Sequence, residues 1–118
     1  MKPKKNQIWG SRLRAQPLEE NVLFCAGRDV KGLPMADEIL LPYDIWTNRA
    51  HCIMLERQGL ISKNILSEIL LGLNLLEKLV DTGEFSLDPA KEDVHINVEE
   101  FVSEKQGIEV GGRMHIGR

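Results

Sequence analysis

The sequence predicts an all-α protein, namely a small three-helix domain preceded by a long irregular N-terminal arm. Apolar residues recur at helical spacing in three separate segments, and no segment shows the alternation that is typical of a strand. The length of 118 residues suits one domain. We therefore divide the chain into an arm over 1–35, a helical domain over 36–107 and a glycine-rich loop over 108–118.

The arm is predicted to be irregular because prolines and glycines interrupt every apolar run in residues 1–35. An unstructured stretch of this length is unusual inside a compact domain. We therefore expect the arm to lie on its own helical domain or on a partner subunit.

The first helix is predicted over residues 36–58. Its apolar residues recur at helical spacing: Ile39, Tyr43, Trp46, Ala50, Ile53 and Leu55. Asp37 can cap or charge the first turn. Pro42 conflicts with a helix interior because it removes a backbone hydrogen bond and kinks the axis, unless the helix starts there. Trp46 is expected to be a core or interface anchor.

Two further helices are predicted over residues 62–82 and 93–106, with Ser62 and Asp93 as their N-caps. The first of these has a broad apolar face, made of Ile65, Leu66, Ile69, Leu70, Leu73, Leu76, Leu79 and Val80. The second has an apolar stripe of Val94, Val98, Phe101 and Val102. Gly72 predicts close packing by another helix, and the first two helices are expected to form an antiparallel hairpin. Residues 111–118 are expected to be a mobile loop.

Composition excludes several classes of protein. The net charge is −3, and the only basic cluster is at the N-terminus, so we expect no nucleic-acid partner. No apolar run approaches the roughly 20 residues that span a bilayer, and we expect no secretory signal because no apolar stretch follows the N-terminal lysines. Cys25 and Cys52 lie outside any CxxC pattern, which favours a reduced, cytoplasmic protein.

Four segments carry a resemblance to a known family. They are Ile8-Trp9-Gly10-Ser11-Arg12; the stretch from Asp37 through Tyr43-Asp44-Ile45 to Gly59-Leu60-Ile61; Gly72-Leu73 followed by Glu92-Asp93-Val94-His95; and Gly112-Arg113-Met114-His115-Ile116-Gly117-Arg118. In this order and spacing they resemble argininosuccinate lyase, a member of the fumarase and aspartase superfamily. The chain departs from the family pattern at Ile116, where a threonine is usual. The family continues with Ser-Arg-Asn-Asp after the position of Arg118, where this chain stops.

The resemblance implies that the helices are domain 1 of the fumarase/aspartase-like lyase fold. It implies a reversible β-elimination that splits argininosuccinate into arginine and fumarate, in a homotetramer whose active sites each draw on three subunits. It implies no metal and no organic cofactor. In agreement, His51 and Cys52 are too few ligands for a metal site, so His51 is expected to be a packed helix residue.

His95 is the first candidate for a catalytic residue. An imidazole titrates near neutral pH and can donate a hydrogen bond to a carboxylate, and the neighbouring Glu92 and Asp93 can set its tautomer. The ordinary alternative is a histidine with a local hydrogen-bonding role. The resemblance implies that His95 is an active-site residue with an orienting or electrostatic role, and that Asp93 belongs to the substrate site.

Five other residues complete the predicted substrate site. His115 and Arg118 lie in the glycine-bracketed loop, where arginine can grip a carboxylate with two hydrogen bonds; the alternative is a disordered tail. The resemblance places Arg28 and Asp29 in a loop near the substrate; the alternative is a surface ion pair. Asp37 resembles a family aspartate near the same place, although helix capping would explain it without a ligand.

Two hypotheses about function follow. The first is an N-terminal domain of argininosuccinate lyase that is inactive alone, because the serine loop and the rest of the site are expected beyond Arg118. The alternative is a non-catalytic helical interaction module derived from a lyase. The DNA beyond the Arg118 codon discriminates between them, since an open frame starting with Ser-Arg-Asn-Asp supports the first and a stop codon supports the second.

Overall fold

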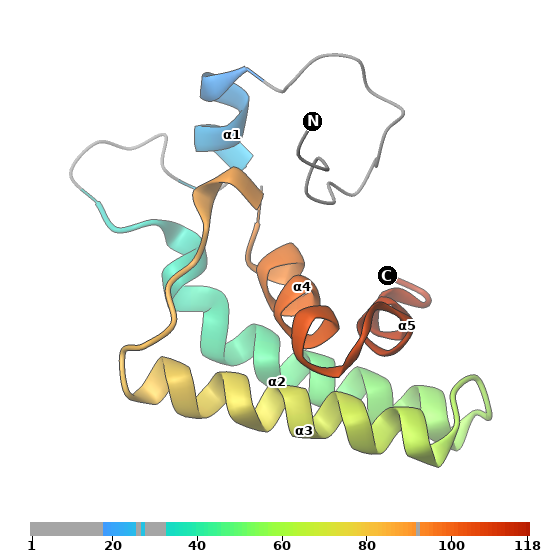
Figure 1. The fold of residues 1–118 in the computed structure, drawn as a ribbon. Coiled ribbons are helices and arrows are strands. Elements are labelled where there is room, and N and C mark those ends of the chain that lie inside the picture. Colours follow the sequence, from blue (N-terminus) through green and yellow to red (C-terminus); the bar gives the residue numbers. More distant parts are fainter. Residues whose placement is uncertain (1–17, 26, 28–32, 92) are drawn as a thin grey trace, which may run out of the picture.

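The computed structural model describes residues 18–25, 27, 33–91 and 93–118. In these ranges all regular structure is helical, as predicted, and there is no strand (Figure 1). The α-helices are α1 (Glu19–Cys25), α2 (Ala36–Arg57), α3 (Lys63–Asp81), α4 (Val94–Gln106) and α5 (Ile108–Gly111), and the 3-10 helices are η1 (Pro89–Lys91) and η2 (Gly112–His115). Helices α2 and α3 form the predicted antiparallel hairpin, and α4 packs against both (Figure 1).

The predicted starts of α3 and α4 are confirmed. Ser62 Oγ accepts a hydrogen bond from the Ile65 amide at 3.2 Å, and Asp93 Oδ1 accepts one from the Ile96 amide at 2.8 Å. Side chains at these N-caps satisfy amides that the first helical turn leaves unpaired. Helix α2 starts six residues before Pro42 and continues through it, so the proline does not mark the start of the helix.

Most of the apolar stripe predicted on α2 does not face the core. Four of its six residues are large and exposed: Ile39 at 64%, Tyr43 at 58%, Trp46 at 60% and Ile53 at 37%. The buried residues of α2 are instead Asp37, Leu41, Ile45, Asn48, Cys52 and Leu55. Two apolar stripes share this helix, and packing against α3 and α4 decides which one is covered. Trp46 is therefore not a core anchor.

The structure also corrects the two regions predicted to be irregular. Residues Glu19–Cys25 of the arm form α1, which is two turns long and lies against η1 (Figure 1). The predicted mobile loop forms α5 and η2, because Val110 and Met114, four residues apart, are buried at 8% and 0% exposure. These helices are too short to show a periodic pattern in the sequence.

The core lies between α2, α3, α4 and η2. Its fully buried apolar side chains are Ile45, Leu55, Ile69, Leu73, Leu76, Val98, Val102, Met114 and Cys52. The close packing predicted at Gly72 is confirmed, because a Cβ there would lie 3.1 Å from Val102 Cγ1 and 3.2 Å from Gln106 Cγ. None of the helices in the described ranges is long and apolar enough to cross a membrane.

Candidate active site

The N-terminus of α4 is fixed by two carboxylates, one from the chain just before it and one from α2. Asp93 caps the helix, and Asp37 Oδ2 accepts a hydrogen bond from the Val94 amide at 2.8 Å. Asp37 lies on α2, but it therefore caps α4 and not its own helix. Burial raises the pKa of Asp37, the Val94 amide opposes this change, and the negative charges of Asp93 and Asp44 add to it.

A buried asparagine ties down the loop before α4. Asn97 is 4% exposed, and its Oδ1 accepts a hydrogen bond from the Asp88 amide at 2.8 Å. Its Nδ2 donates to the carbonyl oxygens of Asp88 at 3.2 Å and Asp93 at 2.8 Å. These bonds hold the loop that leads into α4, and therefore set where the first turn of α4 places His95.

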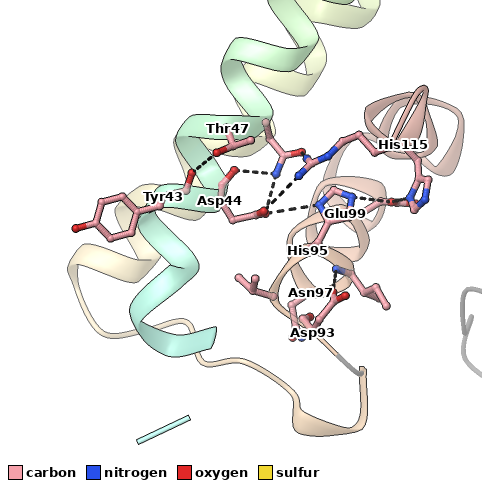
Figure 2. Close-up of polar contacts among 12 residues, drawn as sticks. Tyr43, Asp44, Thr47, Asp93, His95, Asn97, Glu99 and His115 are labelled. Carbon is pink, nitrogen blue, oxygen red and sulfur yellow. Dashed lines mark hydrogen bonds and ion pairs between the residues drawn. The ribbon is translucent and has the colours of Figure 1, made fainter. Parts of the chain in front are cut away.

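His95 lies between two carboxylates (Figure 2). Its Nδ1 is 3.7 Å from Asp44 Oδ2 on α2, and its Nε2 is 3.9 Å from Glu99 Oε2, one turn further along α4. Both distances exceed that of a hydrogen bond. Both ring nitrogens are buried, and neither has a hydrogen-bond partner among the described residues.

His115 reaches the same place from η2. Its Nδ1 is 2.6 Å from Glu99 Oε2, and its ring centroid is 5.5 Å from that of His95. Glu99 thus lies between the two imidazoles (Figure 2). The carboxylate fixes the ring of His115 and brings the two histidines, twenty residues apart in the sequence, into one cluster.

Arg118 joins this cluster to α2. Its Nη1 donates to Asn48 Oδ1 at 2.7 Å, and its Nη2 is 3.7 Å from Asp44 Oδ1. Asn48 is completely buried and donates in turn to Asp44 Oδ2 at 2.7 Å. His51 Nε2 lies 2.7 Å from the carbonyl oxygen of Ile116, so α2 holds the C-terminal segment at two points.

Burial raises the pKa of the Cys52 thiol to about 11, although the positive charge of Arg118 opposes this change. Cys52 is therefore a protonated, inert core residue beside the cluster at neutral pH, and not a nucleophile.

The structure brings together three of the predicted site residues: His95, His115 and Arg118. They face the carboxylates of Asp44 and Glu99, which corrects the expectation that the C-terminal segment would be a disordered tail. Asp37 and Asp93 bind backbone amides at the start of α4. Arg28, Asp29 and Glu92 lie outside the described residues.

Three residues of this cluster were missed from the sequence: Asp44, Asn48 and Glu99. Asn48 carries only a weak signal: it is a polar residue at helical spacing with Leu41, Ile45, Cys52 and Leu55, and the sequence does not show that this stripe is the buried one. Glu99 is four residues after His95 and so shares its helix face.

Chemically, the cluster offers two imidazoles for proton transfer or hydrogen bonding and a guanidinium that can bind a carboxylate. His95, Glu99 and His115 could also hold a metal ion, because their ligand atoms lie within 4.8 Å of one another.

Comparison with known proteins agrees with the motifs. No protein-family model matches the chain. It is 36% identical over 112 residues to an argininosuccinate lyase of Streptomyces griseus, which covers 95% of the chain and 22% of that protein. It is 34% identical over 114 residues to one of Campylobacter jejuni, covering 97% of the chain and 24% of that protein. It is 34% identical over all 118 residues to one of Mycobacterium leprae, covering 24% of that protein.

The chain thus spans less than a quarter of the length of these relatives, while the matches extend over nearly all of its own length. The matched portion is a short N-terminal one. The chain is therefore similar, over nearly all of its own length, to a short N-terminal segment of argininosuccinate lyases.

Proposed function

We propose that this chain forms one wall of the active site of an argininosuccinate lyase, which splits argininosuccinate into arginine and fumarate by β-elimination. The observation that supports this best is the meeting of His95, His115 and Arg118 around two carboxylates (Figure 2). These three residues are among those that the family motifs assign to the site. They come from the start of α4 and from the segment after α5, and only the fold brings them together.

Each of the three side chains has a role that its surroundings support. Arg118 binds a substrate carboxylate, since Asn48 holds its guanidinium in place at 2.7 Å. His95 has two buried ring nitrogens without a hydrogen-bond partner among the described residues, so it can donate to a substrate carboxylate and orient it. His115 is held by Glu99 and presents its other ring nitrogen to the ligand.

The other predicted substrate residues have different support. Asp37 and Asp93 bind the amides that start α4, so we assign them a positioning role for His95. Arg28 and Asp29 are proposed to contact the substrate on the family resemblance alone. The serine loop that completes the site is proposed to belong to the remainder of the enzyme, so this chain alone should be inactive. No cofactor is needed for this chemistry, because proton transfer and fixed hydrogen-bond donors suffice.

We further propose that the complete enzyme is a cytoplasmic homotetramer. The exposed apolar stripe of α2, formed by Ile39, Tyr43, Trp46 and Ile53, supports an association surface. Contiguous apolar surface of this kind usually marks a contact with another polypeptide. The same exposed stripe also favours the alternative function, which is a non-catalytic interaction module.

The test is a chimera in which this chain replaces the matched segment of the Streptomyces griseus lyase. We expect the chimera to sediment as a tetramer and to release fumarate from argininosuccinate, followed by ultraviolet absorbance. His95→Asn should lower kcat about a hundredfold, as loss of a preorganised donor does elsewhere. Glu104→Gln, an exposed change on the same helix, is the control and should leave kcat unchanged.

Two results would contradict the proposal. A folded tetrameric chimera that releases no fumarate would support the interaction module. Turnover by this chain alone, abolished by His95→Asn, would show that it is more than one wall of a shared site.

A further inference from the structure

Three side chains that bind transition metals converge where α4 meets η2: His95, Glu99 and His115. Their ligand atoms lie within 4.8 Å of one another, and each residue is partly buried. From this convergence we infer that the chain binds one divalent transition-metal ion, such as Zn²⁺, through His95 Nε2, Glu99 Oε2 and His115 Nδ1.

The distances suit a tetrahedral ion after small side-chain movements. Zn²⁺ binds nitrogen and oxygen at about 2.0–2.1 Å, so neighbouring tetrahedral ligands lie about 3.3 Å apart. His95 Nε2 is 3.9 Å from Glu99 Oε2, and His115 Nδ1 is 2.6 Å from the same oxygen. These two distances bracket the required separation. The carboxylate would move away from His115 and towards His95, and the two imidazoles would have to approach each other, since the three ligand atoms now lie within 4.8 Å.

The backbone holds the three ligands in place. His95 and Glu99 are one turn apart on α4, so they share a helix face. His115 follows Met114, whose side chain is completely buried in the core. The third ligand is therefore fixed against the first two by packing and not by a flexible loop.

Asp44 provides an independent argument for a metal. Metal-binding histidines usually donate their second ring nitrogen to a carboxylate, which fixes the ring and raises its basicity. Nδ1 of His95 is 3.7 Å from Asp44 Oδ2, on the side away from Glu99. Both ring nitrogens are also buried without a hydrogen-bond partner in the described ranges, an arrangement that a metal and Asp44 together would satisfy.

The donor set selects the class of ion. Two imidazoles and one carboxylate are the ligands of many zinc sites, whereas Ca²⁺ and Mg²⁺ prefer sets made of oxygen alone. Three protein ligands leave a fourth position for water or an anion. If the proposed lyase function holds, bound metal would occupy His95 and His115 and inhibit the enzyme, because both would be withdrawn from the substrate.

The experiment is equilibrium dialysis of Zn²⁺ against this chain, carried out in a Cys25→Ser background. Cys25 is an exposed free thiol, so its removal excludes thiolate binding. We expect one ion per chain. Glu99→Gln should weaken binding at least about tenfold. Glu104→Gln, the same change at an exposed position of α4, should leave the affinity unchanged.

Nuclear magnetic resonance provides a readout that does not depend on any variant folding. The chain has three histidines, so each ring can be followed separately. Zn²⁺ should shift the ring signals of His95 and His115 and leave those of His51 in place. No saturable binding, binding that survives Glu99→Gln in a folded variant, or a shift confined to His51 would overturn the inference.

The metal site and the lyase function can be tested separately. Zinc binding is measured on the chain without any turnover. A chain that binds zinc while its chimera releases no fumarate would refute the function alone, and an active chimera whose chain binds no zinc would refute the metal site alone.

Discussion

Gly111 is the position where a single added methyl group should be most disruptive. It is buried where α5 crosses α4, with an ordinary helical φ of −60°. A Cβ at Gly111 would overlap Ser103 Oγ and lie 2.7 Å from Ser103 N and 2.8 Å from Ser103 Cα. The hydroxyl can rotate away, but the two backbone atoms cannot, so α5 would have to move off α4.

The cost of Gly111→Ala follows from two opposing effects. Overpacking a closely packed site costs about 1–3 kcal/mol, and a clash with backbone belongs at the upper end of that range. The lower entropy of the unfolded alanine chain offsets about 0.4–1 kcal/mol. We therefore expect a net loss of about 2 kcal/mol in the free energy of unfolding. That corresponds to a fall in Tm of roughly 8 °C for a domain of this size.

The neighbouring glycine provides the control. Gly112 has φ −60° and ψ −21°, and a Cβ there would meet nothing within 4 Å. Gly112→Ala should therefore stabilise the chain by about 0.4–1 kcal/mol through the unfolded state. Urea denaturation followed by circular dichroism measures both variants. If Gly111→Ala proved as stable as Gly112→Ala, α5 could not pack on α4 as described, and the placement of His115 beside Glu99 would fail with it.

Two further predictions concern buried titratable groups. Asp37→Ala should cost about 1–3 kcal/mol, because it leaves the buried first amide of α4 unpaired, whereas Asp37→Asn keeps an acceptor and should cost less. Burial raises the pKa of Asp37 in the folded state. The protonated side chain therefore stabilises the fold fully at a pH below the pKa of the unfolded chain, and this stabilisation declines as the pH rises through the pKa of the folded chain. In urea denaturation, the stability of Asp37→Asn relative to the parent chain should therefore be greater at pH 7 than at pH 4. At pH 8 a thiol reagent should label the exposed Cys25 but not Cys52, whose pKa is about 11, until denaturant is added; equal labelling rates would contradict the burial of Cys52.

The sequence predicted α3 and α4 almost to the residue because their determinants are local. Each has an N-cap side chain whose hydrogen bond closes within three residues, and none of the apolar residues predicted for its core face is exposed. Helix α2 was predicted with correct limits but the wrong buried face. It carries two apolar stripes, and the sequence of α2 contains nothing about which stripe meets α3 and α4.

The candidate site was predictable only in part. His95, His115 and Arg118 came from the family resemblance, which also pointed to their shared chemistry. The sequence did not point to their partners Asp44 and Glu99, because these contacts join α2, α4 and η2 and exist only in the folded chain. Periodicity describes a helix by itself and cannot report which side chains of different helices converge.

Three buried polar residues help to hold this site in place. In the described ranges they are Asp37, Asn48 and Asn97. Each bonds to a segment that carries a site residue: Asp37 and Asn97 to the start of α4, and Asn48 to Arg118. Apolar packing is tolerant of small displacements, whereas a hydrogen bond is lost over a fraction of an ångström. The core therefore provides stability through its apolar residues, and its three polar residues fix the position of His95 and Arg118.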